Sequence, residues 1–452
     1  MLHGWGRTAA TASDVVAVHD PRQLPALMTS PHPRGVIARG LGRSYGDAAQ
    51  NAGGTVLDLS RGRDEIELDA ATGTVTASAG TSLDALMRDL LPRGWFVPVT
   101  PGTRAVTVGG AIAADIHGKN HHVDGSFATH VSCLDLVRAD GAVTTIGPDR
   151  DAEAFWATAG GMGLTGVIAR ARIGLIPVET SRMLVDTLRA GDLDDVMARM
   201  EDGDRRHRYS VAWIDVAARG RHLGRSVITA GDHAPLDALT GAARHDPLAF
   251  DPQVRLAAPG LLPNGILNRL SVRAFNELWF RKAPAERRDE VQHLASFFHP
   301  LDGVRHWNRL YGPGGFVQYQ FVVPFGAEQV VRAVIEQLVQ AGAASFLAVL
   351  KRFGIGDPGP LSFPMPGWTL ALDLPARGEL ATLLDRLDRL VLEAGGRLYL
   401  AKDSRLDPAD LPRMYPALDG WRATRARLDP EGQMRSDLGR RLGLLGSAAM
   451  TS

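Results

Sequence analysis

The sequence contains a single cysteine, Cys133, among 452 residues. One thiol cannot form a disulfide within the chain, and it excludes every metal site built from several cysteines. Charge of one sign is also lacking, because 50 basic and 50 acidic side chains balance to a formal net charge of zero. This balance argues against a broad electrostatic surface for nucleic acid, so no nucleic-acid partner is expected.

Long hydrophobic runs are missing as well. The most apolar stretch, 163–177, is interrupted by Arg170 and Arg172, and no run reaches the roughly 18 apolar residues of a membrane span. The N-terminal sequence MLHGWGRTAATASDVV has neither an apolar core nor a twin arginine, so no signal peptide is expected. We therefore expect a soluble protein, cytoplasmic or peripheral at the cell membrane, with the periplasmic side left open.

What the sequence does contain is enough chain for two domains. The first 180 residues alternate short strands with short helices. Alternating residues around Asp140-Gly141 predict a β-hairpin. A helix is predicted over 82–93, because its apolar residues recur at helical spacing, Thr81 or Ser82 can cap its start, and Gly94 follows its end.

The segment 316–402 predicts the order β-α-β-β-α-β, typical of a ferredoxin-like unit with helices on one face of an antiparallel sheet. Residues alternate between the two faces of a strand. The leucines of WTLALDL should therefore face the helices, whereas Gln318, Gln320 and Lys351 should share the open face. That face is either a ligand pocket or a solvated surface, because antiparallel sheets often have one wet face.

Residues 240–270 are apolar, rich in proline and glycine, and lack a sustained period. A long apolar loop is unusual unless it covers or contacts something hydrophobic. The alternative is an ordinary packed connection between elements.

Three familiar motifs are incomplete. Gly40-Leu41-Gly42 follows a strand, but the third glycine of a dinucleotide fingerprint, Gly46, comes one residue too late. His117 and His121 have the spacing of a zinc-binding helix, yet no glutamate follows the first histidine and no third ligand is evident, so no metal is expected. Gly118-Lys119 lacks the Ser or Thr of a phosphate-binding loop.

Two stretches dense in backbone N–H groups remain, RGLGRSYGD (39–47) and PGTRAVTVGGAIAADIHG (101–118). Glycines let the main chain approach an anion closely, and consecutive N–H groups form a nest for phosphate. Two such nests suit a cofactor with a pyrophosphate and a large ring.

These stretches, together with FWATAGGMGLTG (155–166), resemble the FAD-binding domain of the vanillyl-alcohol-oxidase superfamily. WGRT (5–8), NRLYGPGGFVQYQF (308–321), PLSFPMPGW (360–368) and GGRLYLAKDSR (395–405) resemble one branch of it more closely, the decaprenylphosphoryl-β-D-ribose 2'-oxidase family. The matches run from about residue 4 to about residue 444.

The resemblance implies an α+β flavoprotein of two domains. Residues 1–180, completed by 403–452, would form the FAD-binding domain, and 181–402 the substrate-binding domain with the antiparallel sheet. The implied FAD contacts are Ala38, Arg39, Gly40, Leu41, Gly42, Arg43, Ser44, Tyr45, Gly46, Asp47, Ala48, Gly102, Thr107, Val108, Gly109, Gly110, Ala114, Asp115, Ile116, His117, Ile168 and Tyr399.

The implied reaction oxidises the 2'-hydroxyl of a polyprenylphosphoryl ribose to a ketone, the first half of an epimerisation that serves cell-wall arabinan synthesis. The pathway of this reaction implies a keto-reductase partner, and peripheral contact with a membrane is left open. The implied substrate pocket contains Lys119, Gln318, Gln320, Lys351, Ala371 and Lys402, besides Tyr45 and His117.

Lys402, Tyr45 and His117 compete for the role of the base that takes the hydroxyl proton. By strand alternation Lys402 lies on the same side as Leu398 and Leu400, and partial desolvation would lower its pKa.

Two positions depart from the superfamily pattern. Arg43 stands where many members carry a histidine bonded to the flavin, so the FAD should be non-covalent. Ala371 stands where mycobacterial members carry a cysteine, so a thiol is not required there. Two other functions are considered, an aldonolactone or alditol oxidase using O₂ and a flavin-free protein that binds sugar-phosphate lipids.

Overall fold

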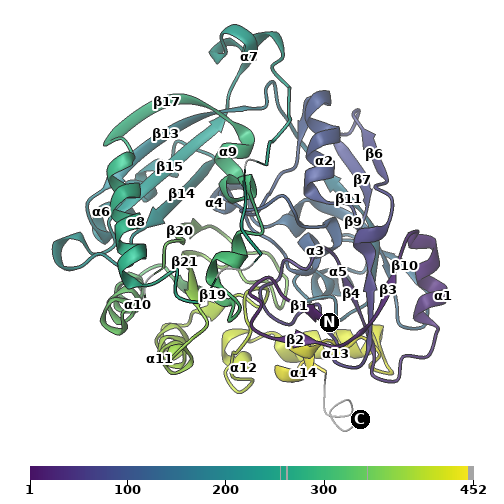
Figure 1. Cartoon of the computed structure of the whole chain (residues 1–452). Coiled ribbons are helices and arrows are strands. Elements are labelled where there is room, and N and C mark those ends of the chain that lie inside the picture. Colours follow the sequence, from purple (N-terminus) through teal and green to yellow (C-terminus); the bar gives the residue numbers. More distant parts are fainter. Residues whose placement is uncertain (255, 261–262, 344, 446–452) are drawn as a thin grey trace.

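The computed structural model describes residues 1–254, 256–260, 263–343 and 345–445, and its N-terminal and central parts lie side by side around separate sheets (Figure 1). The N-terminal part has a parallel sheet ordered β3-β5-β4 and an antiparallel sheet ordered β10-β9-β11-β7-β6. The strands are β3 Asp14–Ala17, β4 Val36–Arg39, β5 Thr55–Asp58, β6 Ile66–Asp69, β7 Thr74–Ser78, β9 Val131–Val137, β10 Val143–Ile146 and β11 Val167–Gly174.

Local signals in this part are confirmed. The hairpin β9–β10 turns at Gly141, whose φ of 79° suits a glycine. Helix α2 starts after Ser82, whose hydroxyl accepts the Ala85 N–H, and Gly94 ends the helical segment with a φ of 80°. The helices here are α1 Leu24–Met28, α2 Leu83–Leu90, α3 Val108–Ala113, α4 His121–Asp124 and α5 Ala152–Thr158.

The central part is an eight-stranded sheet ordered β17-β13-β15-β14-β20-β21-β19-β22, antiparallel at every step. Its two halves repeat one spatial order of four strands and meet where β14 pairs with β20. The strands are β13 Arg182–Ala190, β14 Tyr209–Ile214, β15 Ser226–His233, β17 Glu286–His293, β19 Phe316–Pro324, β20 Ala348–Phe353, β21 Gly367–Pro375 and β22 Arg397–Leu398.

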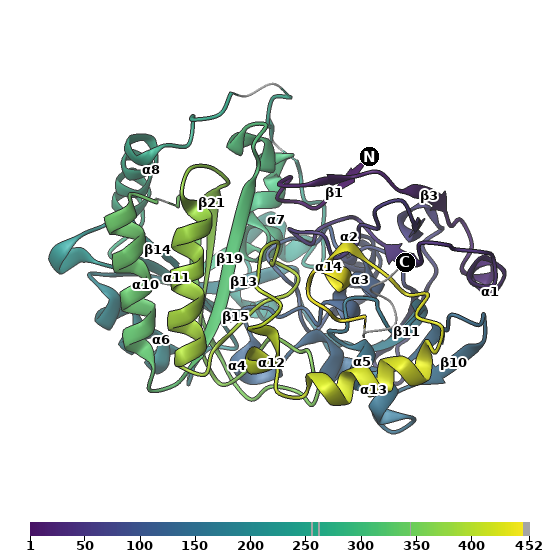
Figure 2. The same ribbon diagram turned by 90° about the horizontal axis from the view of Figure 1, so that it is seen from below.

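The strand and helix order expected over 316–402 is observed, with α10 and α11 lying side by side over β19 and β21 (Figure 2). Leu370, Leu372 and Leu374 of β21 are buried, as the alternation predicted. The helices of the central part are α6 Leu193–Gly203, α7 Gly241–His245, α8 Arg269–Lys282, α9 Leu294–Phe298, α10 Glu328–Ala341 and α11 Leu380–Glu393.

The last strand is shorter than expected. β22 ends at Leu398, and the chain then turns so that the Lys402 N–H donates to the Tyr399 carbonyl at 2.9 Å. The argument that placed Lys402 by strand alternation is therefore wrong, because alternation holds only within an extended strand.

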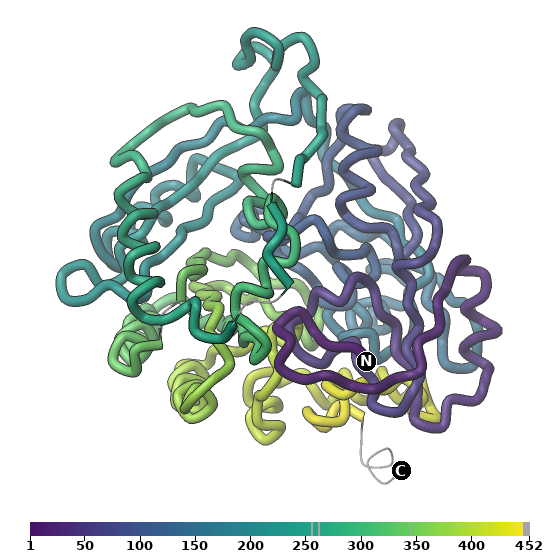
Figure 3. The backbone as a smooth tube through the Cα atoms, in the orientation of Figure 1, coloured from purple at the N-terminus to yellow at the C-terminus, as the bar shows by residue number. Residues whose placement is uncertain are grey.

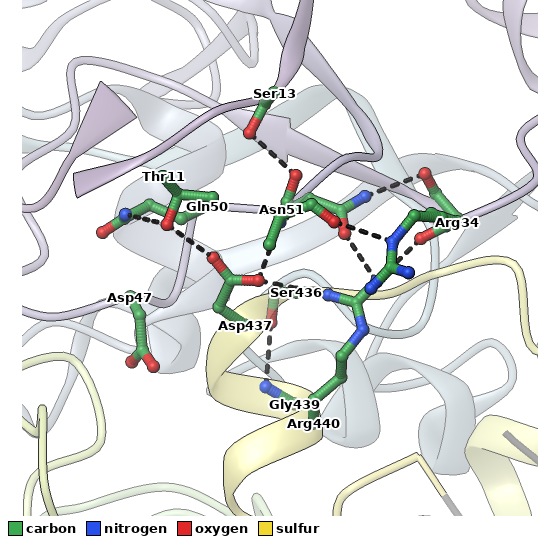
Figure 4. Close-up of polar contacts among 12 residues, drawn as sticks. Thr11, Ser13, Arg34, Asp47, Gln50, Asn51, Ser436, Asp437, Gly439 and Arg440 are labelled. Atoms are coloured by element: carbon green, nitrogen blue, oxygen red, sulfur yellow. Dashed lines mark hydrogen bonds and ion pairs between the residues drawn. The ribbon is translucent and has the colours of Figure 1, made fainter. Parts of the chain in front are cut away.

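Residues 403–445 return to lie beside the N-terminal part (Figure 3). Asp437 accepts hydrogen bonds from the Thr11 hydroxyl and the Ala52 N–H at 2.9 and 2.8 Å, while Arg440 donates to the Asn51 side chain at 2.7 Å (Figure 4). The Trp421 indole donates to the Ala157 carbonyl at 2.8 Å. The helices of this segment are α12 Leu411–Met414, α13 Leu418–Leu428 and α14 Asp437–Arg441.

The stretch 240–270 is irregular in its described residues, apart from α7, a short strand β16 and the start of α8 at Arg269. Residues 255, 261 and 262 lie outside the description. None of the described helices is both long and apolar enough to cross a bilayer. Two-residue strands complete the fold, namely β1 Leu2–His3, β2 Ala10–Thr11, β8 Trp95–Phe96, β12 Ile176–Pro177, β16 Leu256–Ala257 and β18 Val304–Arg305.

Candidate active site

The open face of the sheet is covered by the N-terminal part of the chain. The Gln318 amide donates to the Tyr45 hydroxyl at 3.1 Å, and the side chains of Gln320 and Lys351 each lie 3.0 Å from a ring nitrogen of His117. Gln318 and Gln320 are buried, so the solvated-surface alternative is wrong for this face. Strand alternation thus placed these three residues correctly, and the N-terminal loops supply their partners.

His117 has both of its ring nitrogens engaged. Nε2 meets the Gln320 amide and Nδ1 meets the Lys351 ammonium. Burial, and secondarily the positive charge of Lys351, hold the pKa of His117 well below its usual value. The imidazole is therefore neutral at physiological pH. A zinc ion bound to either ring nitrogen would have to displace the partner there. The described residues contain no group of three or more histidine, cysteine, aspartate or glutamate side chains placed to hold a metal.

Tyr45 and Lys402 form the second centre of the site. The Lys402 ammonium lies 4.0 Å from the centroid of the Tyr45 ring and donates no hydrogen bond to any described residue. Burial lowers the pKa of Lys402 to about 8, although the charge of Asp373 opposes the shift. Burial raises the pKa of Tyr45 well above its usual value, so the phenol stays protonated. Of these two groups, the lysine is the one that can take up a proton near neutral pH.

Asp373 is a site residue to which the sequence analysis gave no role. It stands in β21 directly opposite Gln318 of β19, and the Gln318 amide donates to its carboxyl at 2.5 Å. Complete burial raises the pKa of Asp373 to about 7. A carboxyl near the end of the apolar strand WTLALDL was the available signal, since buried carboxyls need partners.

Lys119 is the third lysine of the site. Its ammonium donates to the Phe297 carbonyl at 2.5 Å and lies 4.0 Å from the Phe297 ring centroid. Burial lowers the pKa of Lys119 and of Lys351 to about 7. Within the described part of the chain, none of Lys119, Lys351 and Lys402 forms an ion pair with a carboxylate. Three partly buried lysine side chains that form no ion pair with a described carboxylate favour the binding of an anion.

The glycine loop, residues 40–47 after β4, is held in place by contacts from other parts of the chain, whereas its own amides stay free. The Tyr45 N–H donates to the Ala401 carbonyl at 2.9 Å, which joins the loop to the Lys402 segment. Arg441 bridges Asp47 and Asp403, each at 2.8 Å. The five consecutive N–H groups of residues 40–44 find no acceptor among the described residues. A Cβ at Gly40 would collide with the Thr107 side chain. These features fit the pyrophosphate of a dinucleotide cofactor.

The second stretch differs from expectation. Residues 108–113 form α3, capped by the Thr107 hydroxyl, which accepts the Gly110 N–H at 3.2 Å. The N–H groups of Val108 and Gly109 donate to carbonyls of Thr81 and Ala79. The prediction of a second open nest is therefore wrong for this segment, because its amides already have partners inside the fold.

The other expected flavin contacts are spread around α3. The Tyr399 hydroxyl donates to the Ala114 carbonyl at 2.7 Å, and the Tyr399 ring lies 5.5 Å from the His117 ring. Ile168 is buried in β11, against which α3 packs, and Gly102 lies exposed in a bend before α3. Asp115 is buried, with Ser362 donating to it at 2.5 Å. Ala371 is half-buried in β21 opposite Gln320.

Comparison with known proteins agrees with this geometry. Residues 12–147, which include the glycine loop and α3, match the family model of the FAD binding domain. The chain is 47% identical over 451 residues, 98% of this chain and 97% of the relative, to decaprenylphosphoryl-β-D-ribose oxidase of Mycolicibacterium smegmatis. The chain belongs to the decaprenylphosphoryl-β-D-ribose oxidase family.

The cofactor of this family member is FAD. An uncharacterized protein in the mprA 5' region of Streptomyces coelicolor is 46% identical over 80% of this chain and 100% of its own length. Cytokinin dehydrogenase 7 of Oryza sativa subsp. japonica is 31% identical over 38% of this chain and 35% of its own length. The match to the M. smegmatis relative therefore extends over the eight-stranded sheet as well as over residues 12–147.

Proposed function

We propose that this protein oxidises the 2'-hydroxyl of a polyprenylphosphoryl-β-D-ribose to the 2'-ketone with FAD. The observation that carries the proposal is the buried polar face on which Lys402, Tyr45, Gln318 and Asp373 gather beside the glycine loop. The relative from M. smegmatis bears the name of this activity and is matched along almost its whole length.

Binding of the cofactor and binding of the substrate belong to different parts of the chain. Residues 1–180, completed by 403–452, bind the FAD, and 181–402 bind the substrate. The hydrogen bonds between 403–445 and the N-terminal part support this division. The strand order β20-β21-β19-β22, with α10 and α11 as connections, supports a ferredoxin-like unit on the substrate side.

FAD bound at the glycine loop would accept a hydride from the alcohol carbon. Lys402 takes the hydroxyl proton, because its lowered pKa leaves a large neutral fraction near pH 8 and no acceptor among the described residues holds its ammonium. Tyr45 and His117 are weaker candidates for the base. The phenol holds its own proton, and both imidazole nitrogens are already engaged.

The remaining residues of the site position the substrate. Lys119 and Lys351 can donate hydrogen bonds to its phosphate, and the negative charge of a bound phosphate would raise their lowered pKa values. Gln320 fixes the His117 ring. Gln318 joins Tyr45 to Asp373 and so sets the distance between the loop and the sheet. Ala371, which pairs with Gln320 across the sheet, supplies no reactive thiol.

The FAD is bound without a covalent link. Arg43 offers no atom for such a bond, and its guanidinium lies 3.9 Å from the Trp5 ring centroid, in a cation–π contact that occupies the side chain. A keto-reductase that completes an epimerisation for arabinan synthesis remains part of the proposal, as does contact with a membrane surface.

Anaerobic mixing of the holoprotein with farnesylphosphoryl ribose tests the function directly. The flavin absorbance should bleach in a single turnover, and the product should carry one ketone. Bleaching by free alditols or aldonolactones but not by the lipid-linked ribose would instead identify a sugar oxidase. Purified protein that stays colourless after addition of FAD would indicate a flavin-free binding protein.

A further inference from the structure

Helix α8, Arg269–Lys282, carries apolar side chains on its outer face. Of its fourteen residues, Val272 and Asn276 are buried. Leu270 is 77% exposed and Leu278 is 68% exposed. Together with Ala274 they recur every four residues and form a stripe opposite the buried pair. Trp279 and Phe275, 45% and 42% exposed, widen the apolar surface at its flank.

Polar contacts hold α8 on the protein. The buried Asn276 amide donates to Asp215 at 2.8 Å, and Arg225 bridges Asp215 and Glu277 at 2.9 and 2.6 Å. Asn268 caps the helix start by accepting the N–H groups of Leu270 and Ser271. The helix thus forms and stays attached without using its outer leucines, which are therefore not explained by the fold of the single chain.

The charge of α8 is positive although the whole chain is neutral. The helix contains four basic residues and one acidic residue, Glu277, which leaves three positive charges in excess. The basic residues are Arg269, Arg273, Arg281 and Lys282. Arg273 and Leu270 also line a hollow of about 430 Å³ together with Arg219, His222 and Arg225. Arginines beside an apolar stripe that is flanked by a tryptophan are typical of helices that lie in a membrane interface.

We propose that the outer face of α8 docks onto the surface of a bilayer that contains anionic phospholipids. Leu270, Ala274 and Leu278 enter the boundary between headgroups and acyl chains, and the arginines contact lipid phosphates. α8 lies at the periphery of the molecule in both ribbon views, where a flat surface can reach it (Figures 1 and 2).

A line of aromatic side chains connects this face to the candidate site. Phe275 lies 5.7 Å from Phe346, and Phe346 lies 5.9 Å from Tyr311. Tyr311 stacks on Phe316 at 4.1 Å, and Phe316 lies 5.4 Å from Tyr45, all measured between ring centroids. Docking through α8 would therefore place this packed aromatic cluster between the bilayer and Tyr45. The docked orientation deepens the proposed function and rests on it, because it would bring the candidate site close to the membrane that holds a lipid-linked substrate.

The full-length holoprotein is tested by flotation with vesicles of phosphatidylcholine alone or of phosphatidylcholine mixed with phosphatidylglycerol. The wild type should float with the mixed vesicles, and binding should weaken as salt rises. Leu270→Ser combined with Leu278→Ser should weaken binding by about tenfold or more, since two interfacial side chains are lost. Val143→Ser, at a 54% exposed position in the β9–β10 hairpin, is the matched control and should bind as the wild type does.

Two results would overturn the membrane surface as the partner. One is a wild type that ignores the mixed vesicles, and the other is a double variant that floats as well as the control. If the double variant instead changes the molar mass of the protein in solution while vesicle binding is unaltered, the stripe covers a second copy of the chain.

Flavin bleaching by farnesylphosphoryl ribose in detergent separates this inference from the proposed function, because the double variant should retain the bleaching. Vesicle binding without bleaching in the wild type would remove the function and leave the docking surface standing.

Discussion

The two faces of strand β21 are both covered, but by different chemistry. Toward α10 and α11 the strand buries Leu370, Leu372 and Leu374, and toward the N-terminal part it presents Thr369 and Asp373. Burial of leucine removes apolar surface from water and stabilises the fold. Burial of a carboxyl opposes ionisation, and the pKa of Asp373 rises to about 7. The leucine face of the strand therefore stabilises the fold. The face with Asp373 buries polar groups at a cost in solvation, and these groups line the candidate site.

The largest expected effect lies on the polar face. Lys402→Ala should slow flavin reduction by about 10²–10⁴-fold, the usual contribution of a positioned base. Thermal unfolding should be little changed, because Lys402 donates no hydrogen bond to a described residue. Single-turnover absorbance measures the rate. A variant that reduces its flavin at the wild-type rate would show that Lys402 has no part in the chemical step.

A substitution on the apolar face of β21 should lower stability and leave the rate of flavin reduction nearly unchanged. Leu372→Ala removes a fully buried side chain and should lower the free energy of unfolding by about 3 kcal/mol. Chemical denaturation followed by fluorescence measures the change. The folded fraction should still reduce its flavin at close to the normal rate, and a rate loss as large as that of Lys402→Ala would break the distinction between the two faces.

Gln318→Leu tests whether the polar face also supports the fold. Loss of its amide leaves the buried carboxyl of Asp373 without that donor and should destabilise the protein by about 2 kcal/mol. The same hydrogen bond lowers the pKa of Asp373, so its removal should raise that pKa further. Denaturation at pH 6 and pH 8 measures both effects, since the added loss should be greater at pH 8, where the wild-type carboxyl is ionised. Equal loss at the two pH values would argue that Asp373 is not the affected group.

The pH dependence of turnover gives the smallest effect. The pKa of Lys402 is lowered to about 8, and only the neutral amine can accept a proton. Flavin reduction should therefore rise by about tenfold between pH 7 and pH 9 and then level off, as expected for titration of a single base. The rise should be absent in Lys402→Ala. A rate that falls over this range would mean that the ammonium form is the active one and merely orients the hydroxyl.

Much of the site followed from local patterns. The period of two in FVQYQFVV and its neighbours placed Gln318, Gln320 and Lys351 on one face. Strand alternation does not place Lys402, because the strand ends at Leu398. The turn after the strand brings the lysine close to Tyr45. The glycines of the stretch 101–118 predict an anion nest, but the Thr107 cap begins a helix at Val108, and Gly109 and Gly110 lie in its first turn. α8 carries no signal for a membrane surface until its buried and exposed residues are known.

The amino-acid sequence by itself determined the strand and helix order, the paired faces of the substrate-side sheet and the glycine loop, because alternation, capping and turn residues act over a few neighbouring positions. The tertiary structure alone decided that the polar face is buried, that His117 sits between Gln320 and Lys351, and that Asp373 and three lysines share one region. Those contacts join residues more than 200 positions apart in the chain. Their effect on each pKa depends on desolvation, which only the packed fold can set.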